Sequence, residues 1–389
     1  MTAGVPQGSV IGPTLWNVLY DGVLRIIALD GVKLVAYADD LAIIVTARDE
    51  SELEFKANYT LGEIKRWMEN HKLEVAPEKS ECMLIVGRKQ YRDMHFLWGG
   101  QEIVQKDNIK YLGVVLDRRL SFQPHLEYIT NKAEKTVTAL ARITPNVGGP
   151  GENKRRVLAT AANSIILYAA PVWVGCLKVK KNREKLLRRQ RIFTLRVSSA
   201  YRTVSTEAAT VIARVIPIDL QIEERAASYG KSKEERGAIR EQTLTKWQER
   251  WEQGQKGAWT RELIRDVIPW YNRRFGEVDF WLTQVLSGHG CFEAFVHKIG
   301  KKASPTCRFC DMIDNAEHTL FVCPRWGQQR ERTNNLVGRR LTKENLIECM
   351  LFSERNWKEV KKLTGEIMRE KAEIERMERE RAHRNGAGG

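Results

Sequence analysis

The sequence lacks any long apolar run. No stretch approaches the roughly 20 consecutive apolar residues that a membrane-spanning helix requires. The first residues, MTAGVPQGS, have neither the basic start nor the apolar segment of a secretory signal. We therefore expect an intracellular protein with no membrane partner. Hydrophobic residues make up 42% and charged residues 29% of the 389 residues, as in globular proteins of two or three domains.

Acidic side chains are scarce in one segment. Residues 132–202 contain 16 Lys and Arg against three Glu, a local net charge of +13, whereas residues 1–50 contain three basic and six acidic residues, a net of −3. This segregation predicts a polyanion-binding surface, although charge alone does not distinguish DNA from RNA. A basic face with no partner is the alternative. The candidate contacts to nucleic acid are Arg155, Arg156, Arg188, Arg189 and Arg191.

The seven cysteines do not suggest a set of disulfides. Four are scattered and are interpreted as buried thiols in a reducing compartment (Cys82, Cys176, Cys291 and Cys349). The other three have metal-ligand spacing with a histidine, as Cys307-x2-Cys310-x7-His318-x4-Cys323. A Cys₃His set favours Zn²⁺ in a closed, structural site; a chance cluster of thiols is the alternative. Nearby side chains offer charge and stacking surface for nucleic acid: Lys301, Lys302, Arg308, Phe309, Arg325 and Trp326.

Residues 1–120 predict a mixed α/β unit. A helix is expected to follow the loop GVPQGSVIGP, and the apolar spacing from Leu53 to His71 predicts an amphipathic helix that begins after Asp49 or Ser51. Short strands are expected at CMLIV (residues 82–86), on both sides of Gly99-Gly100, and at YLGVVL (residues 111–116).

Helices are expected from about residue 125 onward. RRVLATAANSIILYAAPVW (residues 155–173) and REKLLRRQRIFTLRVSSAY (residues 183–201) have apolar faces and basic outer faces. Trp247, Trp251 and Trp259 are interpreted first as a packed helical face and second as base-stacking side chains. Residues 366–389 predict a solvated, charged helix with a disordered end.

Two adjacent aspartates lie between two apolar runs in VAYADDLAIIV, residues 35–45. Strands on either side would fix the backbone of a hairpin and place Asp39 and Asp40 at its tip. Two adjacent carboxylates favour a divalent cation, and phosphoryl transfer by a polymerase requires two Mg²⁺ about 4 Å apart. An ordinary turn is the alternative, because Asp is common in turns.

Four motifs in order resemble reverse transcriptases. YADD (residues 37–40) is similar to the Tyr-X-Asp-Asp catalytic hairpin, GVPQGSVIGPTLWNVLYD (residues 4–21) to the Pro-Gln-Gly motif, LEVAPEKSECMLI (residues 73–85) to the motif after the hairpin, and IKYLGVVLD (residues 109–117) to the primer-gripping hairpin. The residues within these motifs most resemble those of non-long-terminal-repeat retrotransposons, and among these the arthropod type-1 elements that insert into ribosomal RNA genes. The Cys₃His motif is similar to the C-terminal zinc motif of the same class.

The resemblance implies catalytic roles for three residues. Asp39 would bind both Mg²⁺ ions, Asp40 would assist or orient, and Lys79 would protonate or stabilise the leaving pyrophosphate. An ordinary surface lysine is the alternative for Lys79. The residues implied in contacts to primer, template and incoming nucleotide are Gln7, Gly8, Tyr37, Tyr111, Leu112 and Gly113.

The implied fold is α+β: a partial right-hand polymerase palm, with an antiparallel sheet and helices, then a helical thumb and a C-terminal helical region with a small CCHC zinc motif. The expected segments are the palm (residues 1–120), the basic helical thumb (121–235), a helical linker (236–300), the zinc motif (301–330) and a charged helical tail (331–389).

The resemblance also implies partners that this sequence does not contain. The family takes a third aspartate from a strand before the Pro-Gln-Gly motif, and that strand, the fingers region and an N-terminal endonuclease are expected in a longer polyprotein. RNA template, DNA primer or target and dNTP are the implied partners, with action in the nucleus at the site of integration. We expect this chain to be inactive in isolation. The alternatives are a non-catalytic protein that binds nucleic acid through the thumb and zinc motif, and a degenerate product of a pseudogene.

Overall fold

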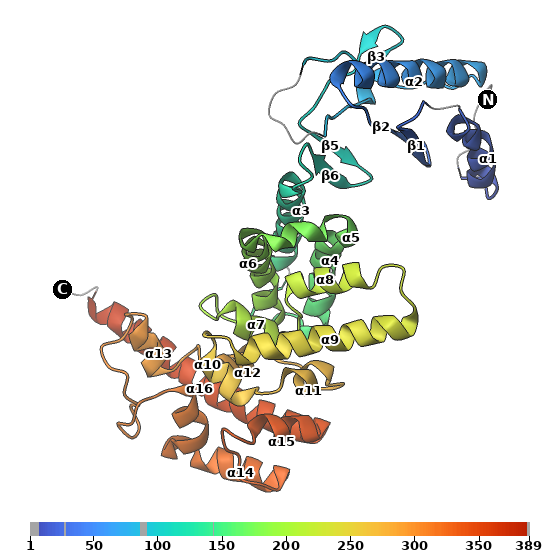
Figure 1. Ribbon diagram of the computed structural model, residues 1–389. Helices are drawn as coiled ribbons and strands as arrows, with labels where there is room; N and C mark the ends of the chain where they lie inside the picture. Colours follow the sequence, from blue (N-terminus) through green and yellow to red (C-terminus); the bar gives the residue numbers. More distant parts are fainter. Residues whose placement is uncertain (1–7, 27–28, 86–91, 143, 387–389) are drawn as a thin grey trace. The chain divides into compact units, whose positions relative to one another are not determined.

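The computed structural model describes residues 8–26, 29–85, 92–142 and 144–386 (Figure 1). The chain divides into two compact units, Met1–His125 and Leu126–Gly389. The first mixes helices with small sheets and the second is helical, so the chain has an α+β fold. None of the described helices is by itself long and apolar enough to cross a membrane, and only the bent pair Glu152–Leu167 and Ala170–Lys178 would pass a test of length and composition.

The described part of the first unit contains two long helices and three two-stranded antiparallel ladders. Its elements are α1 (Gly12–Leu24), β1 (Val32–Tyr37), β2 (Asp40–Val45), α2 (Glu50–Asn70), η1 (Pro77–Lys79), β3 (Leu97–Trp98), β4 (Gln101–Glu102), β5 (Asn108–Tyr111) and β6 (Val114–Asp117). Asp49 caps α2, because its side chain accepts a hydrogen bond from the Glu52 amide at 2.9 Å and so satisfies a free donor of the first turn. Of the two predicted caps, Asp49 is therefore the one used.

Two of the expected strands differ from the structure. In the described part of CMLIV, only Cys82 pairs, in an isolated bridge to Gln105. The expected strand at YLGVVL is instead a hairpin, because Leu112 (φ 44°) and Gly113 (φ 82°) turn the chain between β5 and β6. The apolar run YLGVVL did not indicate this turn, whereas the resemblance of residues 109–117 to the primer-gripping hairpin predicted it.

Apolar side chains on one face of α2 form the core of the first unit. Ile64 and Met68 pack with Tyr20 and Val23 of α1, while Leu61 and its neighbours pack toward the β3–β4 hairpin. The amphipathic stripe predicted for this helix is confirmed. It places α1 and the β1–β2 hairpin against the same helix, which positions the hairpin tip.

The described part of the second unit is built from helices. They are α3 (Gln123–Ala141), α4 (Glu152–Leu167), α5 (Ala170–Trp173), η2 (Val174–Lys178), α6 (Lys180–Val197), α7 (Thr206–Ile212), α8 (Ile218–Ala227), α9 (Lys233–Glu252), α10 (Ala258–Leu263), α11 (Val267–Asn272), α12 (Phe280–Ser287), α13 (Glu293–Lys298), η3 (His318–Val322), η4 (Pro324–Trp326), α14 (Gly327–Val337), α15 (Leu346–Phe352) and α16 (Glu354–Gly386). The helix expected over residues 155–173 breaks at Ala169 (φ 49°), just before Pro171 in the first turn of α5.

One core runs through most of the second unit, from Leu195 to Met368. Trp247 and Trp251 are each 2% exposed and belong to this core, which confirms packing over base stacking for these two. Trp259 is partly buried against the same core. The core residues continue across the predicted boundaries at 235, 300 and 330, so the linker, zinc motif and tail share their packing. The division of this unit into a thumb, a linker, a zinc motif and a tail therefore remains a prediction.

The C-terminal helix differs from the expected solvated tail. Ile367 and Met368 of α16 are at most 1% exposed, and the helix packs against α12, α14 and α15 (Figure 1). Few apolar residues follow Met368, so composition alone suggested a free helix. The structure shows instead that charged residues beyond Met368 pair with the rest of the unit. The expected disordered end at residues 387–389 lies outside the described residues.

A buried carboxylate joins distant parts of the second unit. Glu152, in the first turn of α4, has a fully buried side chain and pairs with Arg156, Arg214 and Arg273. Its Oε2 also accepts a hydrogen bond from the Val278 amide at 2.8 Å. Burial lowers the pKa of Arg273 to about 9, which still leaves the guanidinium charged at pH 7.

Replacement of Glu152 by Gln should strongly destabilise the second unit. Arg273, whose side chain is 1% exposed, would lose its carboxylate partner and remain buried. Breaking a buried pair in this way costs about 3–5 kcal/mol. Urea unfolding followed by tryptophan fluorescence measures the change.

Glu184→Gln is the matched control, because it removes an exposed pair with Arg188 on α6, worth less than about 1 kcal/mol. Equal unfolding midpoints for the two variants would contradict the role assigned to Glu152.

Candidate active site and metal centre

The Asp39-Asp40 pair lies at the tip of the β1–β2 hairpin. Tyr37 pairs with Asp40 at the end of the ladder, so Ala38 and Asp39 form a two-residue turn. Ala38 has φ 53°, a backbone conformation that is unfavourable for a residue with a Cβ. Asp39 and Asp40 are both exposed, and Tyr37 is 65% exposed. The predicted hairpin is confirmed, and its carboxylates are accessible to an ion from solvent.

Helix α1 holds the backbone of this tip. The Trp16 indole Nε1 donates to the Ala38 carbonyl at 2.8 Å, and the Tyr20 hydroxyl donates to the Asp39 carbonyl at 3.4 Å. The two rings stack with centroids 5.0 Å apart. Burial, and then the charges of Asp39 and Asp40, raise the pKa of Tyr20, so its hydroxyl stays protonated as a donor. No sequence pattern indicated this role for Trp16 and Tyr20, although both are polar-tipped aromatics one turn apart.

The other residues implied in catalysis and binding lie elsewhere in the first unit. Lys79 is exposed at the end of η1, and among the described residues no hydrogen bond or ion pair joins it to Asp39 or Asp40. Gly8 has φ 85°, which glycine adopts without strain. Gln7 lies outside the described residues.

The β5–β6 hairpin carries Tyr111, Leu112 and Gly113 at its turn. Behind it, the Val115 amide donates to His125 Nδ1 at 3.2 Å. Burial lowers the pKa of His125 to about 4, so the ring is neutral at pH 7 and can accept this hydrogen bond. His125 thus supports the hairpin from the start of α3, a role that no sequence pattern indicated.

Arg155 does not fit the role predicted for it. It is 4% exposed, and its guanidinium donates to the carbonyls of Thr144, Pro145, Pro150 and Arg196. It is a buried residue that closes the loop before α4, and phosphate cannot reach it. A basic run in the sequence does not reveal which of its side chains point inward.

The four remaining arginines differ in their exposure and in their ion pairs and hydrogen bonds. Arg156 pairs with Glu152, Arg189 pairs with Glu134, and Arg191 donates to backbone carbonyls that include Val204 at 2.8 Å. Arg188 is the most exposed, with a side chain 73% exposed and a weak partner in Glu184. Further exposed cations on these helices were not singled out from the sequence: Lys132, Lys135, Lys154, Lys180, Lys181 and Arg196.

The cysteine and histidine side chains of the second motif converge. One ligand atom from each of Cys307, Cys310, His318 and Cys323 lies within 4.8 Å of the other three. The sulfurs of Cys307 and Cys323 are 3.8 Å apart, and His318 Nε2 is 3.3 Å from the Cys310 sulfur. Zn–S bonds of about 2.3 Å in a tetrahedron place two sulfurs about 3.8 Å apart. The donor set and its spacing therefore fit a tetrahedral metal ion.

Two tight local structures bring these ligands together. A turn encloses the first two cysteines: the Cys307 amide donates to Met312 O at 2.6 Å and the Asp311 amide to Cys307 O at 3.0 Å, with Asp311 at φ 57°. The second pair of ligands is joined by the single π-helical turn η3, across which the Cys323 amide donates to His318 O at 2.8 Å.

Burial shifts the pKa values of three side chains in the cluster. Burial raises the pKa of the Cys307 thiol, raises the pKa of Cys323 to about 12, and lowers the pKa of His318. The thiols of Cys307 and Cys323 are therefore protonated in the absence of a metal, and a bound cation would displace their protons.

Two histidines near the cluster make contacts of their own outside it. His289 contacts Thr203 and the Phe295 ring, and His297 contacts the Lys302 carbonyl. Trp326, expected as a stacking surface, is 1% exposed and belongs to the core, so only Phe309 of that pair, at 38% exposure, can contact a base.

Comparison with known proteins assigns the family. Residues 1–116 match the family of reverse transcriptases (RNA-dependent DNA polymerases). A Pol polyprotein from the type-1 retrotransposable element R1 2 of Nasonia vitripennis is 30% identical over 82% of this chain and 85% of that protein. This chain belongs to the Pol polyproteins of type-1 retrotransposable elements.

Other relatives agree with this assignment. The R1 Pol polyprotein of Bradysia coprophila is 28% identical over 85% of this chain but only 35% of its own length. An RNA-directed DNA polymerase from the mobile element jockey of Drosophila melanogaster is 30% identical over 37% of the chain. No solved structure matches. By family the chain is an RNA-directed DNA polymerase, and a purely non-catalytic nucleic-acid-binding protein is not favoured.

Proposed function

We propose that the first unit carries the catalytic hairpin of target-primed reverse transcription, in which a nicked chromosomal 3′ end in the nucleus primes DNA synthesis on element RNA. The observation that carries the proposal is the exposed Asp39-Asp40 pair on a hairpin tip that Trp16 and Tyr20 hold in place. Fixed backbone and free carboxylates are what a metal-dependent polymerase requires of this element.

The residues of this unit would divide the work. Asp39 and Asp40 would hold Mg²⁺, which when bound activates the primer hydroxyl and stabilises the leaving pyrophosphate. Tyr37 would lie beside the primer end, and Gly8, with Gln7, beside the template base and dNTP. Tyr111, Leu112 and Gly113 would position the primer, and Lys79 would stabilise the pyrophosphate.

The second unit would bind the backbone of the nucleic acid. Exposed cations on α3, α4 and α6, with Arg188 the freest of those first predicted, offer phosphate contacts. The purified chain should therefore bind a primer–template with a strong salt dependence.

The double variant Lys181→Glu/Arg188→Glu tests the binding surface. It should lower the slope of log affinity against log salt by about two, since each lost phosphate contact lowers it by about one. Lys358→Glu is the control, because Lys358 is also exposed but lies on α16. An equal effect of the control would contradict the assigned surface.

We also propose that the Cys₃His cluster binds structural Zn²⁺, because its four protein ligands complete the coordination of this ion. Metal analysis of the purified chain should give about one equivalent of zinc, and Cys307→Ser should lower that amount. Less than about half an equivalent, unchanged by the substitution, would contradict this site.

A further inference from the structure

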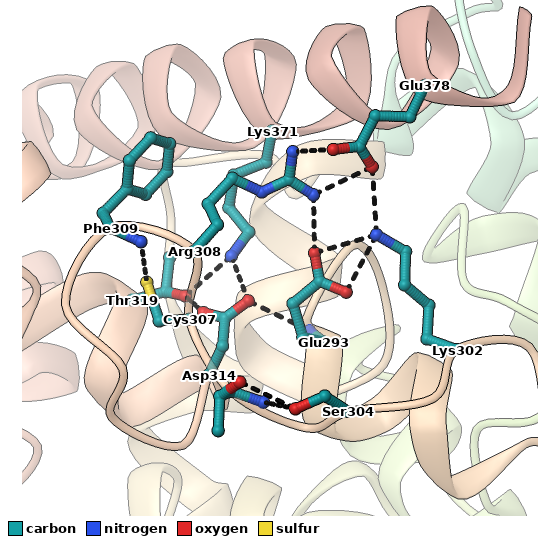
Figure 2. A network of polar contacts seen from close by, with 11 residues as sticks. Glu293, Lys302, Ser304, Cys307, Arg308, Phe309, Asp314, Thr319, Lys371 and Glu378 are labelled. Atoms are coloured by element: carbon teal, nitrogen blue, oxygen red, sulfur yellow. Dashed lines mark hydrogen bonds and ion pairs between the residues drawn. The ribbon is translucent and has the colours of Figure 1, made fainter. Parts of the chain in front are cut away.

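Helix α16 contacts the outside of the metal-binding loop, here called the knuckle (residues 305–323). Figure 2 shows a network of polar contacts in which Lys371 and Glu378 from α16 reach Asp314 and Arg308 of the knuckle. Both knuckle residues lie between metal ligands in the chain, Arg308 between Cys307 and Cys310 and Asp314 between Cys310 and His318. The helix therefore touches both halves of the cluster's framework.

The Asp314 side chain is the innermost part of the network. It is 1% exposed, and its Oδ2 accepts hydrogen bonds from Lys371 Nζ at 2.6 Å and from the Glu293 amide at 2.9 Å. Its Oδ1 accepts one from Thr319 Oγ1 at 2.6 Å. Thr319 follows the ligand His318 directly, so this carboxylate links α16 to the π-helical turn that presents two ligands.

Glu378 fixes the first half of the knuckle, two turns farther along α16. It accepts hydrogen bonds from Arg308 and, at 3.1 Å, from Lys302 Nζ. Arg308 also donates to Glu293 at 2.8 Å. A third contact, between Glu370 and Arg325 at 2.5 Å, lies just past Cys323.

Charge provides a reason for this arrangement. Three thiolates, a neutral histidine and Zn²⁺ have a net charge of −1, which nearby cations stabilise. Lys371 and Arg308 line one small cavity together with Cys307 and the carboxylates of Glu293, Asp314 and Glu375, and Arg330 donates to the Cys323 carbonyl at 2.7 Å. The helix thus supplies one cation, Lys371, and fixed geometry to a cluster whose four ligands all lie elsewhere.

We propose that α16 is the outer shell of the metal site, so that docking of residues 370–378 and metal binding at the knuckle stabilise each other. The inference rests on the proposed Zn²⁺ site and extends it to a helix that contributes no ligand. Coupling of this kind is reciprocal: weakening the helix contacts lowers metal affinity, and removing the metal loosens the helix.

Lys371→Met tests one direction of this coupling. Zinc affinity, measured by competition with a chromophoric chelator, should fall by about tenfold or more, as outer-shell substitutions generally cause. Lys358→Met removes an exposed lysine from the same helix and should change the affinity by less than about twofold. Circular dichroism shows whether each variant is folded, and equal affinities in two folded variants would overturn the inference.

Hydrogen exchange of the unmodified chain tests the other direction and does not depend on a variant folding. Chelation of zinc should speed amide exchange both in the knuckle and in residues 370–378. Faster exchange in the knuckle alone would overturn the inference while leaving the zinc site intact. A chain that contains no zinc before chelation would overturn the zinc site itself, and the inference with it.

Discussion

The second unit depends on one buried carboxylate. Glu152 lies at the start of α4 and gathers three guanidinium groups from positions up to 121 residues away in sequence. The Arg273 guanidinium also lies over the Trp270 and Trp357 rings, at 4.1 and 4.8 Å from their centroids. Trp357 belongs to α16, so the same cluster connects the basic helices with the helix that borders the metal-binding loop.

That connection explains why the helices after Leu195 and the region around the Cys₃His cluster share a core. A charge buried at this depth is stable only with its partners in place, which ties the start of α4, the end of α11 and the start of α16 to one arrangement. The knuckle therefore packs against helices whose arrangement this buried cluster already holds in place. The first unit has its own device, the hydrogen bonds from α1 to the backbone of the Asp-Asp turn.

The sequence predicted the elements whose signals are local. The hairpin around Asp39-Asp40, the helix after Asp49 and the four ligands of the Cys₃His cluster all follow from patterns in short segments of the chain. Predictions were wrong where burial depends on distant partners. Arg155 was assigned to the surface although its partners are backbone carbonyls, and residues after Met368 were assigned to a solvated tail although their charges pair with Asp314 and Arg308. Charge composition does not distinguish a paired lysine from a free one.

We propose that the Asp39-Asp40 hairpin, rather than the basic helices or the knuckle alone, receives the primer end. A primer–template with a photoreactive group on its 3′-terminal nucleotide tests this directly when it is cross-linked to the chain and the attachment sites are mapped. We expect cross-links within residues 37–41 and 108–117. Cross-links confined to residues 132–202 or 301–330 would contradict it.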